Sequence, residues 1–220
     1  MPVRRNPTAG DYALGAIGAA AALLLAVLVF AIPRMAGEGE HSATSSNEPT
    51  VEEEDPFTIE LLADGRGILL AGRLSHGMTE QLESLLGGGA PIIHIELNSP
   101  GGLVAEARGL VRLIDAYNLS TFVAEDCLSA CTLAFASGST RHLAPGARLG
   151  FHRYRLASPL MPLFMDAAQE QRKDREILRR RGVPQAFIER IDATPPEAMW
   201  FPSHAELIAA HMVDRIGPPD

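Results

Sequence analysis

The feature that most constrains this chain is a pair of apolar runs, each ending in a tight turn that leads into a helix. The first run, residues 92–97, is followed by Asn-Ser-Pro-Gly-Gly at 98–102, and the second, residues 121–124, by Cys-Leu-Ser-Ala-Cys at 127–131. Alternating strands and helices with short loops predict an α/β domain around a mostly parallel sheet. Open sheets of this kind keep their sites at the carboxyl ends of neighbouring strands. The two turns are therefore expected to meet, with the Ser129 hydroxyl facing free backbone N–H groups.

Hydrophobic periodicity and turn residues place the remaining elements of this domain. Strands are predicted at 57–62, 67–74, 92–97, 120–125 and 148–152, and helices at 78–86, 103–117, 129–136, 163–181 and 184–192. The helix at 129–136 is almost wholly apolar, so it is expected to be buried. No internal repeat is visible, and the length fits one compact domain, residues 57–220, with appendages.

The net charge of −8 is concentrated in one segment that precedes this domain. Residues 37–55 hold seven acidic side chains and no Lys or Arg, which leaves −1 for the rest of the chain. A segment this polar cannot bury a core, so residues 33–56 are expected to form an extended, disordered linker. Because the folded part is near neutral, nothing supports a nucleic-acid partner.

The N-terminal region predicts a membrane anchor. Residues 13–32 are twenty uncharged, mainly apolar residues, about the length needed to cross a hydrocarbon core of roughly 30 Å. Arg4 and Arg5 precede them, so the positive-inside tendency predicts a single-pass protein with residues 1–12 cytoplasmic and an extracytoplasmic C-terminal domain, periplasmic in a bacterium. A cleaved signal peptide is the alternative, although Arg34 is awkwardly placed for a cut after Ala36.

The chain has two cysteines, Cys127 and Cys131, and they flank Ser129. In an oxidising compartment they would form a disulfide that braces the turn. The alternative is a pair of small buried hydrophobic side chains, which is how free cysteines usually behave. No Cys or His group has metal-ligand spacing, so neither a metal nor another cofactor is expected.

Several segments, in this order, resemble the Clp protease proteolytic-subunit and crotonase superfamily, and most closely its Clp-type serine peptidases. They are Gly-Ile-Leu-Leu-Ala-Gly-Arg-Leu at 67–74, Ile-Glu-Leu-Asn-Ser-Pro-Gly-Gly at 95–102, Ser129 before its apolar helix, Leu-Gly-Phe-His at 149–152, and the tail at 201–216. The resemblance covers about residues 57–216 and implies a Clp protease/crotonase-like fold. The Asn-Ser-Pro-Gly-Gly run is its most specific part.

The resemblance implies that Ser129 is a nucleophile and that the amides of Gly102 and Ala130 form an oxyanion hole. It also places Gly101 and Leu103 beside the substrate, where glycine lets the backbone approach closely. Taken alone, Ser129 has a simpler explanation, because serine also caps helices.

A serine hydroxyl needs a neighbouring base, and His152 at the end of its strand is the best candidate, although a histidine at a strand end needs no catalytic role. The acid of the triad departs from the family pattern, because counting back from Phe201 places Met199 where the family has an Asp. Asp192 is predicted to take that role, with Glu197 as a second option. A Ser–His dyad without a carboxylate would be weaker but not inert.

The leading hypothesis is a membrane-anchored extracytoplasmic serine peptidase that hydrolyses peptides or unfolded polypeptide by acyl transfer through Ser129. A Ser–Lys membrane peptidase is an alternative, and it requires Lys173 to point into the site. A catalytically impaired Clp-like scaffold or oligomeric binding protein is another, favoured by Met199. A crotonase-like acyl-CoA enzyme fits less well, because it would not need Ser129.

A homo-oligomer is also expected. Relatives in this superfamily associate through the corresponding long helix, here residues 163–181. That helix is almost entirely charged apart from its first residues and Ile177 and Leu178. Both apolar side chains are therefore expected to be exposed on the monomer and to meet a partner subunit.

Overall fold

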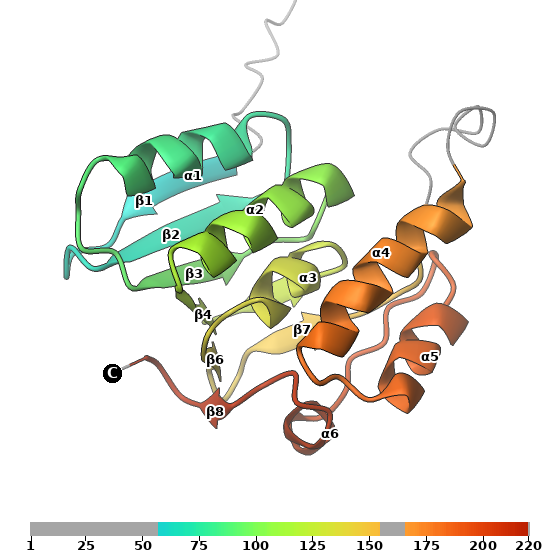
Figure 1. Cartoon of the computed structure of the whole chain (residues 1–220). Helices are drawn as coiled ribbons and strands as arrows, with labels where there is room; N and C mark the ends of the chain where they lie inside the picture. The colour runs from blue at the N-terminus through green and yellow to red at the C-terminus, as the bar shows by residue number, and fades with distance from the viewer. Residues whose placement is uncertain (1–56, 155–165, 220) are drawn as a thin grey trace, which may run out of the picture. The chain divides into compact units, whose positions relative to one another are not determined.

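The computed structural model describes residues 57–154 and 166–219, which form an α/β domain (Figure 1). The predicted membrane span at 13–32 and the acidic linker at 33–56 lie outside the described residues. Within the described part, no helix combines the length and the apolar character needed to cross a membrane.

A six-stranded sheet forms the centre of the domain, and it is mostly parallel, as predicted. Its order is β1 (Phe57–Leu61), β2 (Gly67–Gly72), β3 (His94–Asn98), β4 (Ser120–Val123), β6 (Arg141–Leu143) and β8 (Arg215–Ile216). Only the pairing of β1 with β2 is antiparallel, because a tight turn joins these two strands. The register that pairs Ala71 with Asn98 places the start of the Asn-Ser-Pro-Gly-Gly turn at the carboxyl edge of this sheet.

A second sheet has two short parallel strands, β5 (Asp126–Leu128) and β7 (Arg148–Gly150). An isolated bridge between Ser99 and Cys127 links β5 to the turn that follows β3. Sequence analysis did not predict β5 or β6. Each is three residues long and includes a charged residue, so neither forms an apolar run.

The helices are α1 (Met78–Gly87), α2 (Val104–Ala116), α3 (Cys131–Ala136), α4 (Ala167–Arg180), α5 (Gln185–Ala193) and α6 (His204–Ala209). Figure 1 shows α1 and α2 side by side over the β1–β3 part of the sheet, with α4 and α5 beyond α3. All six residues of α3 are buried, which confirms the expectation for this apolar helix. Each large apolar side chain buried there contributes about 1.5–3 kcal/mol.

Helix α4 differs from its prediction in two respects. It begins at Ala167, because the Asp166 carboxylate caps it by accepting hydrogen bonds from the amides of Ala168 (2.9 Å) and Gln169 (3.2 Å). In addition, Ile177 and Leu178 are 9% and 8% exposed and belong to the core of their own domain. The expectation that both side chains are exposed on the monomer is therefore wrong, and α4 packs against α3 and α5.

Candidate active site

Ser129 follows β5 directly and has a left-handed backbone conformation, with φ of 54°. This conformation is uncommon for residues other than glycine, and such strain often occurs at functional sites. Hydrogen bonds hold it on two sides. The Ser129 amide donates to the Gly150 carbonyl (2.8 Å), and the Ser129 carbonyl accepts from the Thr132 hydroxyl (2.7 Å). The side chain is thus presented at the turn between β5 and α3.

The Asn-Ser-Pro-Gly-Gly turn lies directly against this serine. Gly101 is buried with φ of 88°, and a Cβ there would lie 2.6 Å from the Leu128 carbonyl oxygen and 2.8 Å from Ser129 Cβ. Gly102 has φ of 149°, and its Cβ would lie 2.4 Å from the Leu74 carbonyl oxygen. Because no side chain fits at either position, glycine is what lets the two turns meet as predicted.

The amides of Gly102 and Ala130 both belong to residues that line the cavity at Ser129. Among the hydrogen bonds of the described residues, neither amide donates to a protein acceptor. The neighbouring amides are occupied, since those of Gly101 and Leu103 donate to the Ser99 hydroxyl and the Leu74 carbonyl. Gly102 and Ala130 therefore offer two N–H groups beside Ser129, as an oxyanion hole requires.

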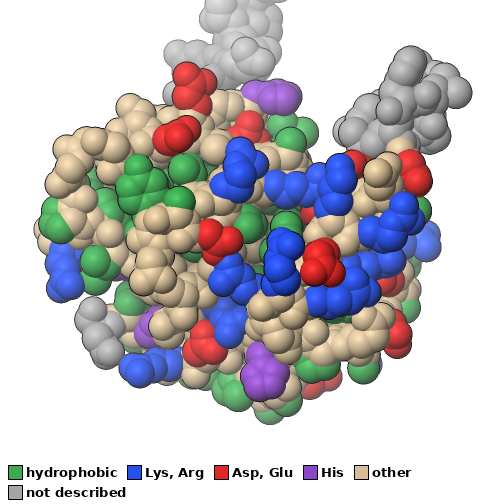
Figure 2. All heavy atoms as spheres, viewed as in Figure 1, with side chains coloured by type: hydrophobic (Ala, Val, Ile, Leu, Met, Phe, Trp, Pro, Cys, Tyr) green, Lys and Arg blue, Asp and Glu red, His purple; other side chains and the backbone are tan. Residues whose placement is uncertain are grey.

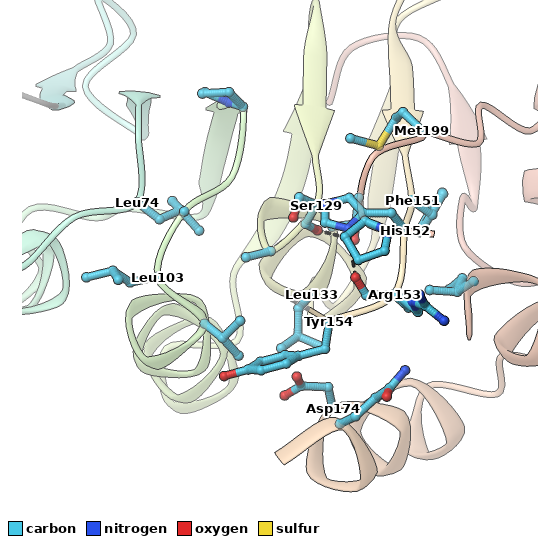
Figure 3. A pocket seen from close by; sticks show the side chains of 18 of the residues that line it. Leu74, Leu103, Ser129, Leu133, Phe151, His152, Arg153, Tyr154, Asp174 and Met199 are labelled. Carbon is cyan, nitrogen blue, oxygen red and sulfur yellow. Dashed lines mark hydrogen bonds between the residues drawn. The ribbon is translucent and has the colours of Figure 1, made fainter. Parts of the chain in front are cut away.

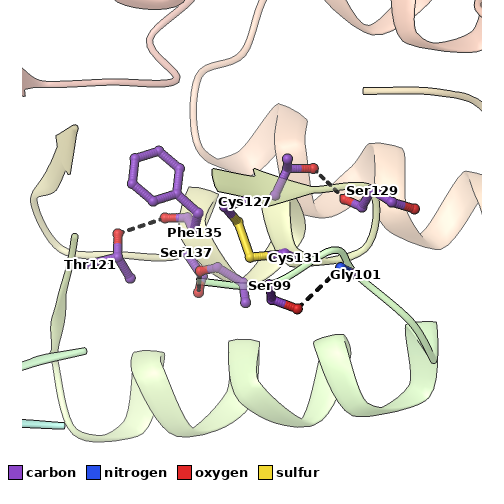
Figure 4. Close-up of a disulfide and its surroundings, with 10 residues drawn as sticks. Ser99, Gly101, Thr121, Cys127, Ser129, Cys131, Phe135 and Ser137 are labelled. Atoms are coloured by element: carbon purple, nitrogen blue, oxygen red, sulfur yellow. Dashed lines mark hydrogen bonds between the residues drawn. A yellow bond between two sulfur atoms is a disulfide. The ribbon is translucent and has the colours of Figure 1, made fainter. Parts of the chain in front are cut away.

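Cys127 and Cys131 are joined by a disulfide (Figure 4), with a Cα–Cα distance of 5.4 Å. Of the two alternatives for these cysteines, the structure has the bridge. Both cysteines are fully buried. The disulfide closes a ring of five residues around Ser129 and Ala130. It therefore ties the start of α3 to β5.

His152 lies two residues beyond Gly150, the residue that accepts the Ser129 amide. Its side chain lines the same cavity as Ser129, and Figure 3 shows both side chains at one wall of that cavity. His152 Nδ1 is 2.8 Å from the Arg153 carbonyl oxygen. No hydrogen bond joins Ser129 and His152 among the described residues; in unliganded sites such bonds are often long and tighten on substrate binding. The predicted pair is thus brought together but not hydrogen-bonded.

The carboxylate predicted to complete a triad is engaged elsewhere. Asp192 lines the cavity, but its oxygens accept a hydrogen bond from Gln171 and form a 2.6 Å ion pair with Arg175. It makes no hydrogen bond to His152, so in this structure it does not take the third triad position predicted for it.

Met199, which stands at the family's acid position, and Glu197, the second option, do not provide a carboxylate partner for His152. Met199 packs on Gly150, where a Cβ would lie 2.9 Å from its Cγ and Sδ atoms. Glu197 lines the cavity with an exposed side chain, and none of the hydrogen bonds found for the described residues joins it to His152.

Lys173 does not point into the site. Its side chain is 53% exposed and donates to Glu170 (2.6 Å), and it is absent from the residues that line the cavity. Figure 2 shows Lys and Arg side chains gathered over α4, where Lys173 lies. The orientation that a Ser–Lys peptidase requires is therefore not found here.

The cavity has a volume of about 790 Å³ and extends from Ser129 to α4. Its apolar lining includes Leu74, Leu103, Leu133, Leu178 and Phe151. Leu103, predicted to lie beside a substrate, is thus in this wall. The described residues contain no group of His, Cys, Asp and Glu that could hold a metal ion.

Sequence analysis missed the polar groups at the far end of this cavity, where Figure 3 shows Asp174 and Tyr154. Asp174 accepts a hydrogen bond from Arg108 (2.7 Å), which also pairs with Glu170. Burial raises the pKa of the Asp174 carboxyl, and the Arg108 hydrogen bond opposes that rise. The i, i+4 spacing of Glu170 and Asp174 is the signal that could have indicated a shared cation.

Comparison with known proteins adds no assignment: no family model matches this chain, and no curated protein matches it.

Proposed function

We propose that this chain is a membrane-anchored serine peptidase of the Clp type, which hydrolyses peptides or unfolded polypeptide on the extracytoplasmic side of a membrane. One observation carries the proposal: a strained Ser129, His152 and two amides that have no acceptor among the described residues share one cavity. Resemblance to the Clp-type peptidases supplies the family and the substrate class.

The mechanism is acyl transfer. Ser129 Oγ attacks the carbonyl carbon of a peptide bond while His152 Nε2 takes the hydroxyl proton. The amides of Gly102 and Ala130 stabilise the oxyanion of the tetrahedral intermediate. His152 then donates this proton to the leaving amine, and the acyl group stays on Ser129. A water molecule, deprotonated by His152, releases the acyl group as a carboxylic acid and restores the serine.

Two features support the location. The Cys127–Cys131 disulfide suits an oxidising compartment, because disulfides persist outside the cytoplasm. The uncharged segment at 13–32, preceded by Arg4 and Arg5, matches a single-pass anchor with a cytoplasmic N-terminus. A homo-oligomer remains part of the proposal on the superfamily resemblance alone, since the burial of Ile177 and Leu178 removes the surface argument for it.

A second candidate is a catalytically impaired Clp-like scaffold or oligomeric binding protein. The observation that favours it is that, among the described residues, no carboxylate accepts a hydrogen bond from His152. Asp192 is paired to Arg175, and Met199 is packed on Gly150. Such a protein would keep the fold and the cavity but would not activate Ser129.

Reaction of the full-length chain with a fluorophosphonate probe separates the two candidates, because only an activated serine reacts quickly. Ser129→Ala should abolish labelling and leave the thermal unfolding midpoint nearly unchanged. Ser139→Ala is the matched control, since Ser139 is exposed, donates its hydroxyl to the Asn118 carbonyl and lies outside the cavity lining. Equal labelling of Ser129→Ala and wild type would reject the peptidase proposal, and no labelling of wild type would favour the scaffold.

A further inference from the structure

The contact between His152 and Arg153 determines which ring nitrogen of the histidine carries a proton. A carbonyl oxygen can only accept a hydrogen bond, so the Nδ1 atom, 2.8 Å from the Arg153 carbonyl oxygen, must be the donor. In the neutral imidazole the lone pair then lies on Nε2. This is the tautomer that a general base needs in order to accept a proton from a serine.

The backbone that leads to this carbonyl is attached by hydrogen bonds on both sides of His152. The Arg153 amide donates to the Thr194 carbonyl (2.9 Å), at the end of α5. On the other side, Phe151 and Trp200 exchange two hydrogen bonds of 2.9 Å. The histidine is therefore held between two attachment points on the segment 194–200. The carbonyl is placed by the fold rather than by a mobile side chain.

The side chains that might have oriented the ring do not do so. Asp192 is bound to Gln171 and Arg175, and Met199 packs on Gly150. Within the described part of the chain, the hydrogen bond that Nδ1 donates is accepted by the main chain alone.

We infer that the main-chain carbonyl of Arg153 is the positioning group for His152 and takes the place of a side-chain acid. The inference rests on the proposed function. A neutral carbonyl stabilises a developing imidazolium less than a carboxylate does, so acylation is slower than with a complete triad. The ring nevertheless has the correct tautomer. The tautomer matters, because replacing the Asp of a triad by Asn imposes the wrong one and lowers the rate about 10⁴-fold.

The direct test is a long-range ¹H–¹⁵N correlation spectrum of the full-length chain labelled with ¹⁵N-histidine, recorded at about pH 9, where histidine side chains are neutral. The His152 signals are those that disappear in His152→Gln. We expect the proton on Nδ1 and an unprotonated Nε2. A proton found on Nε2 would overturn the inference.

Two substitutions at Arg153 test whether this tautomer depends on the hydrogen bond from the Arg153 amide to Thr194. Arg153→Pro removes the amide that bonds the Thr194 carbonyl, so it should raise the population of the Nε2–H form and slow probe labelling at least tenfold. Arg153→Ala keeps the main chain and should keep the Nδ1–H form. If Arg153→Pro folds and retains both the wild-type tautomer and the wild-type rate, the hydrogen bond to Thr194 is not what holds the positioning carbonyl in place. If it does not fold, the wild-type spectrum decides.

The spectrum and the labelling separate the two proposals. An Nδ1–H tautomer in a protein that no fluorophosphonate labels would reject the peptidase and retain the orientation of His152. Rapid labelling of Ser129 together with an Nε2–H tautomer would retain the peptidase and reject the role of Arg153.

Discussion

The nucleophile turn (residues 127–131) and the histidine arm (residues 151–154) face the same cavity but are held in different ways. The nucleophile turn is closed by a disulfide, hydrogen-bonded to Gly150 on one side and packed against Gly101 on the other. The histidine arm has no covalent link and is held by backbone hydrogen bonds to Thr194 and Trp200.

This difference indicates where the site tolerates change. The strained backbone at Ser129 must be held tightly, because relaxation of its φ of 54° would move both the hydroxyl and the Ala130 amide. The histidine arm needs only the correct orientation of one ring. We therefore expect the largest losses from substitutions that disturb the nucleophile turn.

The largest effect is expected from Gly101→Ala. The new Cβ would meet the Leu128 carbonyl oxygen at 2.6 Å and Ser129 Cβ at 2.8 Å, in a backbone conformation that alanine disfavours. Overpacking and strain together should lower the free energy of unfolding by about 3 kcal/mol. Probe labelling should fall at least 100-fold, since moving catalytic groups by about 1 Å can cost that much.

Gly65→Ala is the matched control, because Gly65 also has positive φ (66°) but nothing lies within 4 Å of the added Cβ. Denaturant unfolding of the two variants should show a smaller loss for Gly65→Ala, about 1–2 kcal/mol, and normal labelling. Similar losses in both variants would show that the close contact with Ser129 is unimportant.

Removal of the disulfide should have the next largest effect. For a closed ring of about five residues, the loop-entropy relation gives a loss of about 2 kcal/mol in Cys127→Ala/Cys131→Ala. Reduction of the wild type by a dithiol should destabilise it similarly and slow labelling, as measured by thermal unfolding and probe reaction. The chain has two cysteines in all, so the double variant should not respond to the dithiol. A response of the double variant would show that the dithiol does not act through this disulfide.

Acid should destabilise the domain through His94, at the start of β3. Burial lowers the pKa of His94 below its usual value near 6.5, although the charge of Asp64 opposes this. The unfolded chain therefore binds the proton more readily, and stability falls as the pH drops below about 6.5. Urea unfolding at pH 7 and pH 5 measures this loss, which should diminish in His94→Leu. An equal loss in that variant would exclude His94 as the cause.

The smallest effect is expected from an ion pair between the two strands that lead into these regions. Asp126 on β5 and Arg148 on β7 form a 2.6 Å ion pair, and both side chains are partly exposed. The Arg148 hydrogen bond lowers the pKa of Asp126, so the pair is lost as the pH falls below the usual range of an aspartate. Because exposed pairs contribute little, Asp126→Asn should shift the unfolding midpoint less than the double cysteine variant does. A larger shift would make this pair a main link between β5 and β7.

The same contrast explains which parts of the site could be predicted from the sequence. The nucleophile turn depends on residues with strong backbone requirements, such as Gly101 and Gly102, and on a serine before an apolar helix. Those residues are visible in the sequence. The group that orients His152 is a main-chain carbonyl, which every residue has, so no residue type marks it. The position of Asp192 in the sequence favours a role beside His152, but Arg175 from α4 binds it.

The fold shows a similar division. Long apolar or periodic segments such as β2, β3 and α2 were predicted close to their observed bounds. The three-residue strands β5 and β6 were not, because their pairing comes from neighbours distant in the sequence. The wrong expectation that Ile177 is exposed has the same cause: one helix alone does not reveal that its apolar side chains are buried in the core of the domain.

The central claim is that His152 activates Ser129. The most direct measurement is the rate of fluorophosphonate adduct formation, followed by intact mass, for the full-length wild type and His152→Gln, with the adduct mapped by peptide mass spectrometry. The account predicts one adduct on Ser129 and a rate at least 100-fold lower in the variant, since a general base contributes about 10²–10⁴. Equal rates for the two proteins, or an adduct on another residue, would contradict it.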